Sequence, residues 1–140
     1  MVKRFSIYIV MAVLLLGCAH NQQQTLFDKL GGHDGLTNIV NGLIKQIAKD
    51  KQIFHYFEDT RISRFRTHLV DHFCAITDGP CEYTGDTMTD IHTGMKISES
   101  DFNRLVDLLI KAMELQNIPH PVQNQLLARL APLRSQIIYI

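Results

Sequence analysis

The segment RFRTHLVDHFCAITDGPCEYTGDTMTDIHTGMKI (residues 64–97) contains three histidines, two cysteines and a Gly-Pro turn. Its first part continues an apolar stripe with helical spacing, which predicts a helix over residues 61–77. The stripe consists of Ile62, Phe65, Leu69, Phe73 and Ile76. His68 and His72 flank the stripe, and the Gly-Pro turn ends the helix because proline cannot continue it. The chain then returns through a loop to His92, which can face His68 across a slot.

Further helices are predicted on both sides of this segment. Residues 33–49 carry apolar side chains three and four positions apart, and Thr25 can cap a short helix before them. Ser98 and Asp101 form a capping box that opens a helix extending to residue 117. A last helix covers residues 122–138, with a break expected at its internal proline. No segment alternates with a period of two, so the fold class is all-α, in one domain over residues 25–140.

Composition supports a globular domain and excludes one class of partner. The chain has 140 residues, of which 46% are hydrophobic, enough for a real core. Its 14 basic and 14 acidic residues give no net charge, so the sequence has no electrostatic footprint for nucleic acid.

Residues 1–17 have the pattern of a targeting segment. Lys3 and Arg4 precede an apolar run, residues 7–16, that is too short to span a bilayer comfortably. The following Leu-Leu-Gly-Cys resembles the lipobox of bacterial lipoproteins, in which Cys18 is acylated and becomes the first mature residue. An ordinary secretory signal or a short buried helix would fit the same residues. Ala19 favours the outer membrane facing the periplasm, and residues 18–24 form a polar tether.

The histidines allow three kinds of site. An iron porphyrin needs an apolar slot and one neutral imidazole on the iron, which His92 could supply, with His68 opposite. A zinc enzyme could use His68, His72 and His92, although Leu69 stands where H-E-x-x-H enzymes carry their glutamate. A lipoprotein without a cofactor is the third reading.

The order of several short motifs resembles the group I truncated haemoglobins. These motifs are LFDKLGG (26–32), GPCEYTG (79–85), Met88 and His92. The resemblance implies a two-over-two helical globin that encloses haem b, with His92 as the proximal iron ligand. By position, Phe57 packs on the porphyrin and His68 can occupy the sixth coordination site. Phe65, Leu69, Phe73, Met88 and Ile44 complete the implied pocket.

The resemblance implies reversible binding of O₂, NO or CO, with a bis-histidyl electron-transfer or redox-sensing protein as the alternative. NO dioxygenation would need an electron donor that the sequence does not identify. Many members carry a tyrosine where this chain has Ile44. Losing its hydrogen bond would weaken oxygen retention by roughly ten- to a hundredfold unless another donor compensates. Asp78 also replaces a glycine before the proline, which restricts that turn.

The cysteines and arginines of the segment suggest two further contacts. Cys74 and Cys81 lie seven positions apart, and an oxidising envelope would favour a disulfide between them, with two free thiols as the alternative. Arg64 and Arg66 could reach the haem propionates or could be solvated surface residues.

Overall fold

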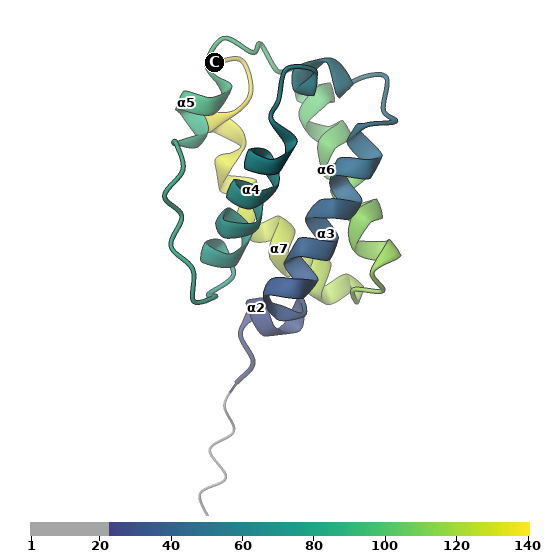
Figure 1. Cartoon of the computed structure of the whole chain (residues 1–140), viewed down its shortest axis with the longest axis vertical. Helices are drawn as coiled ribbons and strands as arrows, with labels where there is room; N and C mark the ends of the chain where they lie inside the picture. The colour runs from purple at the N-terminus through teal and green to yellow at the C-terminus, as the bar shows by residue number, and fades with distance from the viewer. Residues whose placement is uncertain (1–22) are drawn as a thin grey trace, which may run out of the picture.

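The structure, a computed structural model, describes residues 23–140 (Figure 1). The signal segment, Cys18 and residues 18–22 of the polar tether lie outside the described residues. The elements are α2 (Leu26–Lys29), α3 (Gly32–Ile47), η1 (Phe54–Phe57), α4 (Ile62–Ile76), α5 (Met88–His92), α6 (Glu99–Leu115), α7 (His120–Leu130) and η2 (Ala131–Gln136). Residues 23–140 contain no strand, which confirms the predicted all-α class.

The longest helices are α3, α4, α6 and α7, and they adopt the two-over-two arrangement expected from the resemblance (Figure 1). Helix α3 packs against both α4 and α6, and α7 contacts α2 and η2. Helices α3 and α6 lie close together at Gly42, since a Cβ there would lie 3.3 Å from the Cβ of Ala112. The fully buried core around these helices is formed by Leu30, Leu36, Ile39, Val40, Ala112, Met113 and Leu126.

The predicted helix ends are largely confirmed. Thr25 and Ser98 each form a complete capping box, with Asp28 and Asp101 as their partners. The last helix differs from the prediction because it begins at His120 and stops at Leu130. A 3₁₀ segment follows, with Pro132 near its start, where the missing N–H prevents a continuous helix.

Asp50 joins the end of α3 to α6. Its Oδ1 accepts hydrogen bonds from the backbone N–H groups of Gln52 (3.0 Å) and Ile53 (3.1 Å), and its Oδ2 accepts one from Arg104 Nε (2.7 Å). Burial alone would raise the pKa of Asp50, but the bonds from Arg104 and the two N–H groups hold it below its ordinary value. This buried carboxylate therefore fixes the turn that leads to η1.

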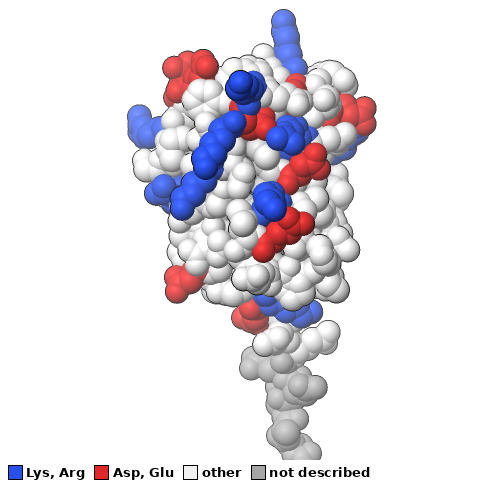
Figure 2. Space-filling model, turned by 90° about the vertical axis from the view of Figure 1, so that its right-hand side faces the viewer, with Lys and Arg blue, Asp and Glu red and all other residues white. Residues whose placement is uncertain are grey.

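Surface charges are mixed in sign on the side of the molecule where α6 lies. Figure 2 shows basic and acidic side chains interspersed there, and Lys111 and Glu114 of α6 form one such pair at 3.4 Å. Among residues 23–140, no helix combines the length and the apolar character needed to cross a membrane.

We expect Asp50→Ala to lower the free energy of unfolding by about 2–4 kcal/mol, because it leaves two N–H groups and a guanidinium without their buried acceptor. Urea denaturation measures the change. Asp59→Ala, at an exposed position, is the control and should stay within about 0.5 kcal/mol of the wild type. Equal effects of the two changes would contradict the role of Asp50.

Candidate functional site

A cavity of about 490 Å³ lies between α4, α5, α6 and η2. Its walls are mostly aliphatic and aromatic, with a few polar side chains: Tyr56, Thr60, His68, His72, Tyr83, His92 and Asp101. Of the residues that the sequence assigned to a pocket, the following line it: Phe57, Phe65, His68, Leu69, Phe73, Met88 and His92. The cavity is thus an apolar slot with imidazoles from two helices, α4 and α5.

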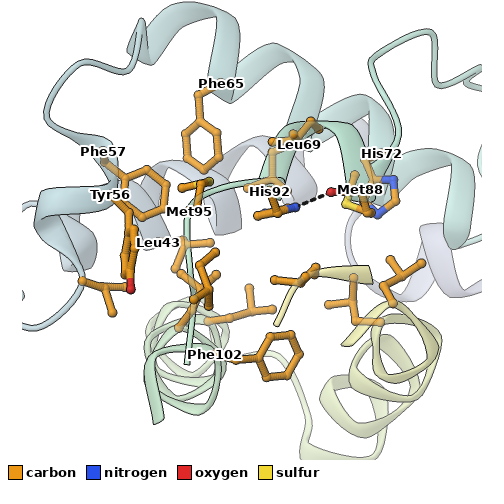
Figure 3. Close-up of a pocket in the computed structure, with 18 of the residues that line it drawn as sticks. Leu43, Tyr56, Phe57, Phe65, Leu69, His72, Met88, His92, Met95 and Phe102 are labelled. Atoms are coloured by element: carbon orange, nitrogen blue, oxygen red, sulfur yellow. Dashed lines mark hydrogen bonds between the residues drawn. The ribbon is translucent and has the colours of Figure 1, made fainter. Parts of the chain in front are cut away.

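His92 is the last residue of α5 and is half-buried in the wall. Thr87 starts this short helix by accepting a hydrogen bond from the Asp90 N–H at 3.1 Å. One turn along, Nδ1 of His92 donates to the Met88 carbonyl at 2.6 Å (Figure 3). Because a carbonyl only accepts, the proton is on Nδ1, and Nε2 keeps its lone pair for a metal. The same bond orients the ring.

The two histidines of α4 differ in their surroundings. His68 is half-buried, whereas His72 is buried and its Nε2 has no hydrogen-bond partner in the described structure. Burial lowers the pKa of His72, so its ring is neutral near pH 7. The ring of Tyr83 packs against both, with centroids 6.4 Å from His68 and 5.0 Å from His72. The sequence predicts a flanking position for His72, because its burial and its unpaired nitrogen depend on packing with residues distant in the chain.

Ile44 is the one assigned pocket residue that the structure leaves out of the lining. Leu43, one position earlier on α3, lines the cavity instead, while Ile44 packs partly buried against the core. Successive helical residues point about 100° apart, so a shift of one position moves a side chain off the wall. A nonpolar side chain from α3 still faces the cavity.

A polar network missed by the sequence analysis closes one side of the cavity. Tyr56 donates from its hydroxyl to Asp101 Oδ2 at 3.0 Å, and Gln52 Nε2 donates to Oδ1 at 3.1 Å. Hydrogen bonds from Ser98 and Gln52 lower the pKa of Asp101 to about 2, against the opposing effect of burial. The capping box of α6 thereby also holds the aromatic corner at η1. Only the capping box was visible in the sequence.

The loop between α4 and α5 is tied to α4 by a disulfide. The structure joins Cys74 to Cys81, with their Cα atoms 5.7 Å apart. Gly79 is needed in this turn, since a Cβ there would lie 2.6 Å from Cys74 Sγ. Asp78 takes a left-handed φ of 64° and pairs with Arg129 at 2.8 Å. The turn is thus restricted as expected: Asp78 adopts a left-handed backbone conformation, and its carboxylate pairs with Arg129.

The two arginines offered for cofactor contacts lie outside the lining. Arg64 and Arg66 are exposed, and Arg64 lies 4.0 Å from Asp86. In the part of the chain that the structure describes, no three His, Cys, Asp or Glu side chains gather as metal ligands. His68, His72 and His92 therefore do not form the zinc site considered from the sequence.

The residues present fit an iron porphyrin. The cavity offers apolar walls, His92 with a free Nε2, and the imidazole of His68 from α4. An all-helical fold with such a pocket defines a haem protein of the globin kind.

Comparisons with known proteins give the family. A family model described as bacterial-like globin matches residues 25–139, and the chain belongs to this family. The group 1 truncated hemoglobin GlbN of Mycolicibacterium paratuberculosis is 28% identical over 113 residues, covering 81% of this chain and 83% of that protein. GlbN of a Nostoc species is also 28% identical, over 81% of this chain and 97% of the relative.

Solved structures show the same fold. The truncated hemoglobin of Tetrahymena pyriformis in its Fe(III) form matches with a TM-score of 0.79 at 23% identity, covering 82% of this chain and 98% of that one. The group II truncated hemoglobin of Bacillus anthracis matches with a TM-score of 0.75 at 17% identity, over 84% and 93% of the two chains. The protein is a haem-binding globin, with haem iron as its cofactor.

The buried His72 predicts a pH dependence of the haem-free protein. Because its folded pKa is lowered, the unfolded chain binds more protons below about pH 6.5, and the free energy of unfolding falls as the pH falls. His72→Phe should lose less stability than the wild type between pH 7.5 and 5.5, measured by urea denaturation. The other histidines are common to both proteins, so an equal loss in both would contradict burial of a neutral His72.

Proposed function

We propose that this globin reversibly binds O₂ or another diatomic ligand on an iron held by His92. The observation that carries the proposal is the hydrogen bond from His92 Nδ1 to the Met88 carbonyl, which leaves Nε2 free for the metal. The relatives named group 1 truncated hemoglobin support the same reading. When bound, haem supplies an iron centre with a coordination position for the gas.

The chain's own residues orient His92 and supply apolar surface around it. The Met88 carbonyl holds the Nδ1 proton, which directs Nε2 towards a metal, and fixes the orientation of the ring. Phe57 and Phe65 form an edge-to-face pair with centroids 5.3 Å apart on the cavity wall. These aromatic rings offer packing surface to a flat macrocycle and no competing ligand.

The side chains of the cavity wall next to α4 determine whether the sixth coordination position of the iron is open to a gas or filled by a histidine. Leu43 of α3 and Leu69 of α4 line this wall with aliphatic side chains, and α4 also contributes the half-buried His68 and the buried His72. If His68 occupies the sixth position, the protein is a bis-histidyl electron-transfer or redox-sensing protein. A ferric low-spin spectrum that is lost in His68→Leu would favour that second function, and a five-coordinate wild type would exclude it.

Turnover such as NO dioxygenation is a further proposal and would require an external electron donor. The α3 wall is nonpolar at Leu43, so a hydrogen bond to bound oxygen, worth about 1.5–3 kcal/mol, would have to come from an imidazole of α4 such as that of His68.

We also propose that the mature protein is a lipoprotein of the outer membrane, facing the periplasm. The support is Leu15-Leu16-Gly17-Cys18 after a basic and apolar leader, with Ala19 next. The Cys74–Cys81 disulfide agrees with an oxidising compartment. Two or more acyl chains would give a stable anchor.

His92→Gly should bind haem more weakly by at least about 100-fold, since losing even an outer-shell partner of a metal ligand costs about 10- to 100-fold. Haem titration followed by the Soret absorption measures the affinity. Free imidazole should restore much of the spectrum by filling the space left by the side chain. Unchanged haem affinity in His92→Gly would contradict the assignment.

Cys18→Ser should abolish lipid anchoring of the full chain expressed in a Gram-negative bacterium. Detergent-phase partitioning, membrane fractionation and intact mass of the product measure it. The double variant Cys74→Ser with Cys81→Ser is the control and should still partition into detergent. A wild-type product with an unmodified Cys18 in the aqueous phase would refute the anchor.

A further inference from the structure

The loop between α4 and α5 contributes a single side chain to the cavity wall. Of residues 77–87, only Tyr83 lines the cavity. Within the part of the chain that the structure describes, no backbone–backbone hydrogen bond holds positions 80–86. Side-chain contacts must therefore fix this stretch of the wall, and three features of the loop converge on Tyr83.

These features hold the Tyr83 ring in one place. The Cys74–Cys81 disulfide ties the chain to α4 two positions before the tyrosine. The Tyr83 hydroxyl donates to the Asp86 carbonyl at 2.8 Å. Gly85 leaves room for the ring, since a Cβ there would lie 2.4 Å from the Tyr83 hydroxyl oxygen. The loop is thus built around the position of this one aromatic side chain.

The Tyr83 ring packs against both histidines of α4. It meets His68 with centroids 6.4 Å apart at 80°, and His72 with centroids 5.0 Å apart at 67°. Both pairs are edge-to-face, an arrangement that aromatic rings prefer. His72 is buried and its Nε2 is closed off by protein, so it backs the Tyr83 ring. His68 is only half-buried on the cavity wall, so its contact with Tyr83 is the one that can be broken.

His68 lies to one side of the row of α4 that enters the pocket. Phe65 and Leu69 point from α4 into the pocket (Figure 3). At about 100° per residue, His68 is rotated by about 60° from Phe65 and by about 100° from Leu69, to the flank where Tyr83 lies. An iron bound by His92 lies towards the middle of the pocket. To reach it, the His68 ring must turn inwards from the flank and leave Tyr83.

We propose that Tyr83 is a positioning residue that holds the His68 imidazole on the loop side of α4 and so keeps the sixth coordination position of the iron open to a gas. The inference rests on the proposed binding of the iron by His92. Turning His68 onto the iron costs its edge-to-face contact with Tyr83, so this contact shifts the population towards the open site. The aromatic ring supplies the effect, and the hydroxyl only fixes the ring.

The test measures the ratio of His68-bound to open iron in the purified haem complex, from the low-spin fraction in ferric spectra and from the rate of CO binding to the ferrous form. The wild type should be mainly open. Tyr83→Leu should raise the ratio about 2- to 10-fold, the range that corresponds to one aromatic pair. Tyr83→Phe keeps the ring and should stay near the wild type. Phe54→Leu, which removes an exposed ring outside the lining, should leave the ratio unchanged.

Two further measurements identify the residue that moves. Adding His68→Leu to Tyr83→Leu should remove the extra low-spin species, because the new ligand is His68. In the haem-free protein, NMR should show a ring-current shift of the His68 ring protons in the wild type and in Tyr83→Phe. Tyr83→Leu should lose this shift, which reports the contact without any iron.

Three results would overturn the proposal: a fully low-spin wild type, an unchanged ratio in Tyr83→Leu, or a low-spin species that survives His68→Leu. Failure of the wild type to form any Soret complex with haem b would instead refute the haem site itself, and this inference with it. If Tyr83→Leu does not fold, the double variant Cys74→Ser with Cys81→Ser decides. It frees the loop and should also raise the ratio, so an unchanged ratio there contradicts the proposal.

Discussion

The hydrogen bond from His92 Nδ1 to the Met88 carbonyl determines which ring nitrogen can bind iron, and the surrounding structure serves to keep it in place. Helix α5 is only one turn long, so it depends on contacts outside itself. The Gly94 N–H donates to the Ile140 carbonyl and the Tyr139 N–H to the Ile97 carbonyl, each at 3.0 Å. The C-terminal residues thus fix the segment that follows α5, while the Cys74–Cys81 bridge fixes the loop before it.

The domain separates a close-packed half from an open half. Helices α3 and α6 meet at Gly42 and Ala112 and carry most of the fully buried core, whereas the α4 and α5 side encloses the cavity. Asp50 with Arg104 joins the end of α3 to α6, and Tyr56 with Asp101 joins η1, beside the cavity, to α6. Such contacts hold a cavity open where apolar packing alone would favour collapse, because hydrogen bonds specify geometry that dispersion does not.

Much of the fold follows from local sequence patterns. The apolar spacing of α3, α4 and α6, the capping boxes at Thr25 and Ser98, and the break near Pro132 all depend on residues close in sequence. The contacts of Asp50 with Arg104 and of Tyr56 with Asp101 span 54 and 45 positions, so no local sequence pattern predicts them. The sequence also assigned Ile44 to the cavity wall, whereas Leu43 lines it. The rotation of α3 about its axis decides which of the two faces the cavity, and that rotation depends on packing against other helices. His92 was assigned from the family order of motifs rather than from spacing.

The most direct test of the account is a titration of the purified haem-free protein with ferric haem, followed by absorption in the ferric, ferrous and CO-bound states. The account predicts a Soret band that saturates at one haem per chain and shifts on reduction and on addition of CO. A folded protein that leaves the spectrum of free haem unchanged would contradict the claim that this cavity is a haem pocket closed by His92.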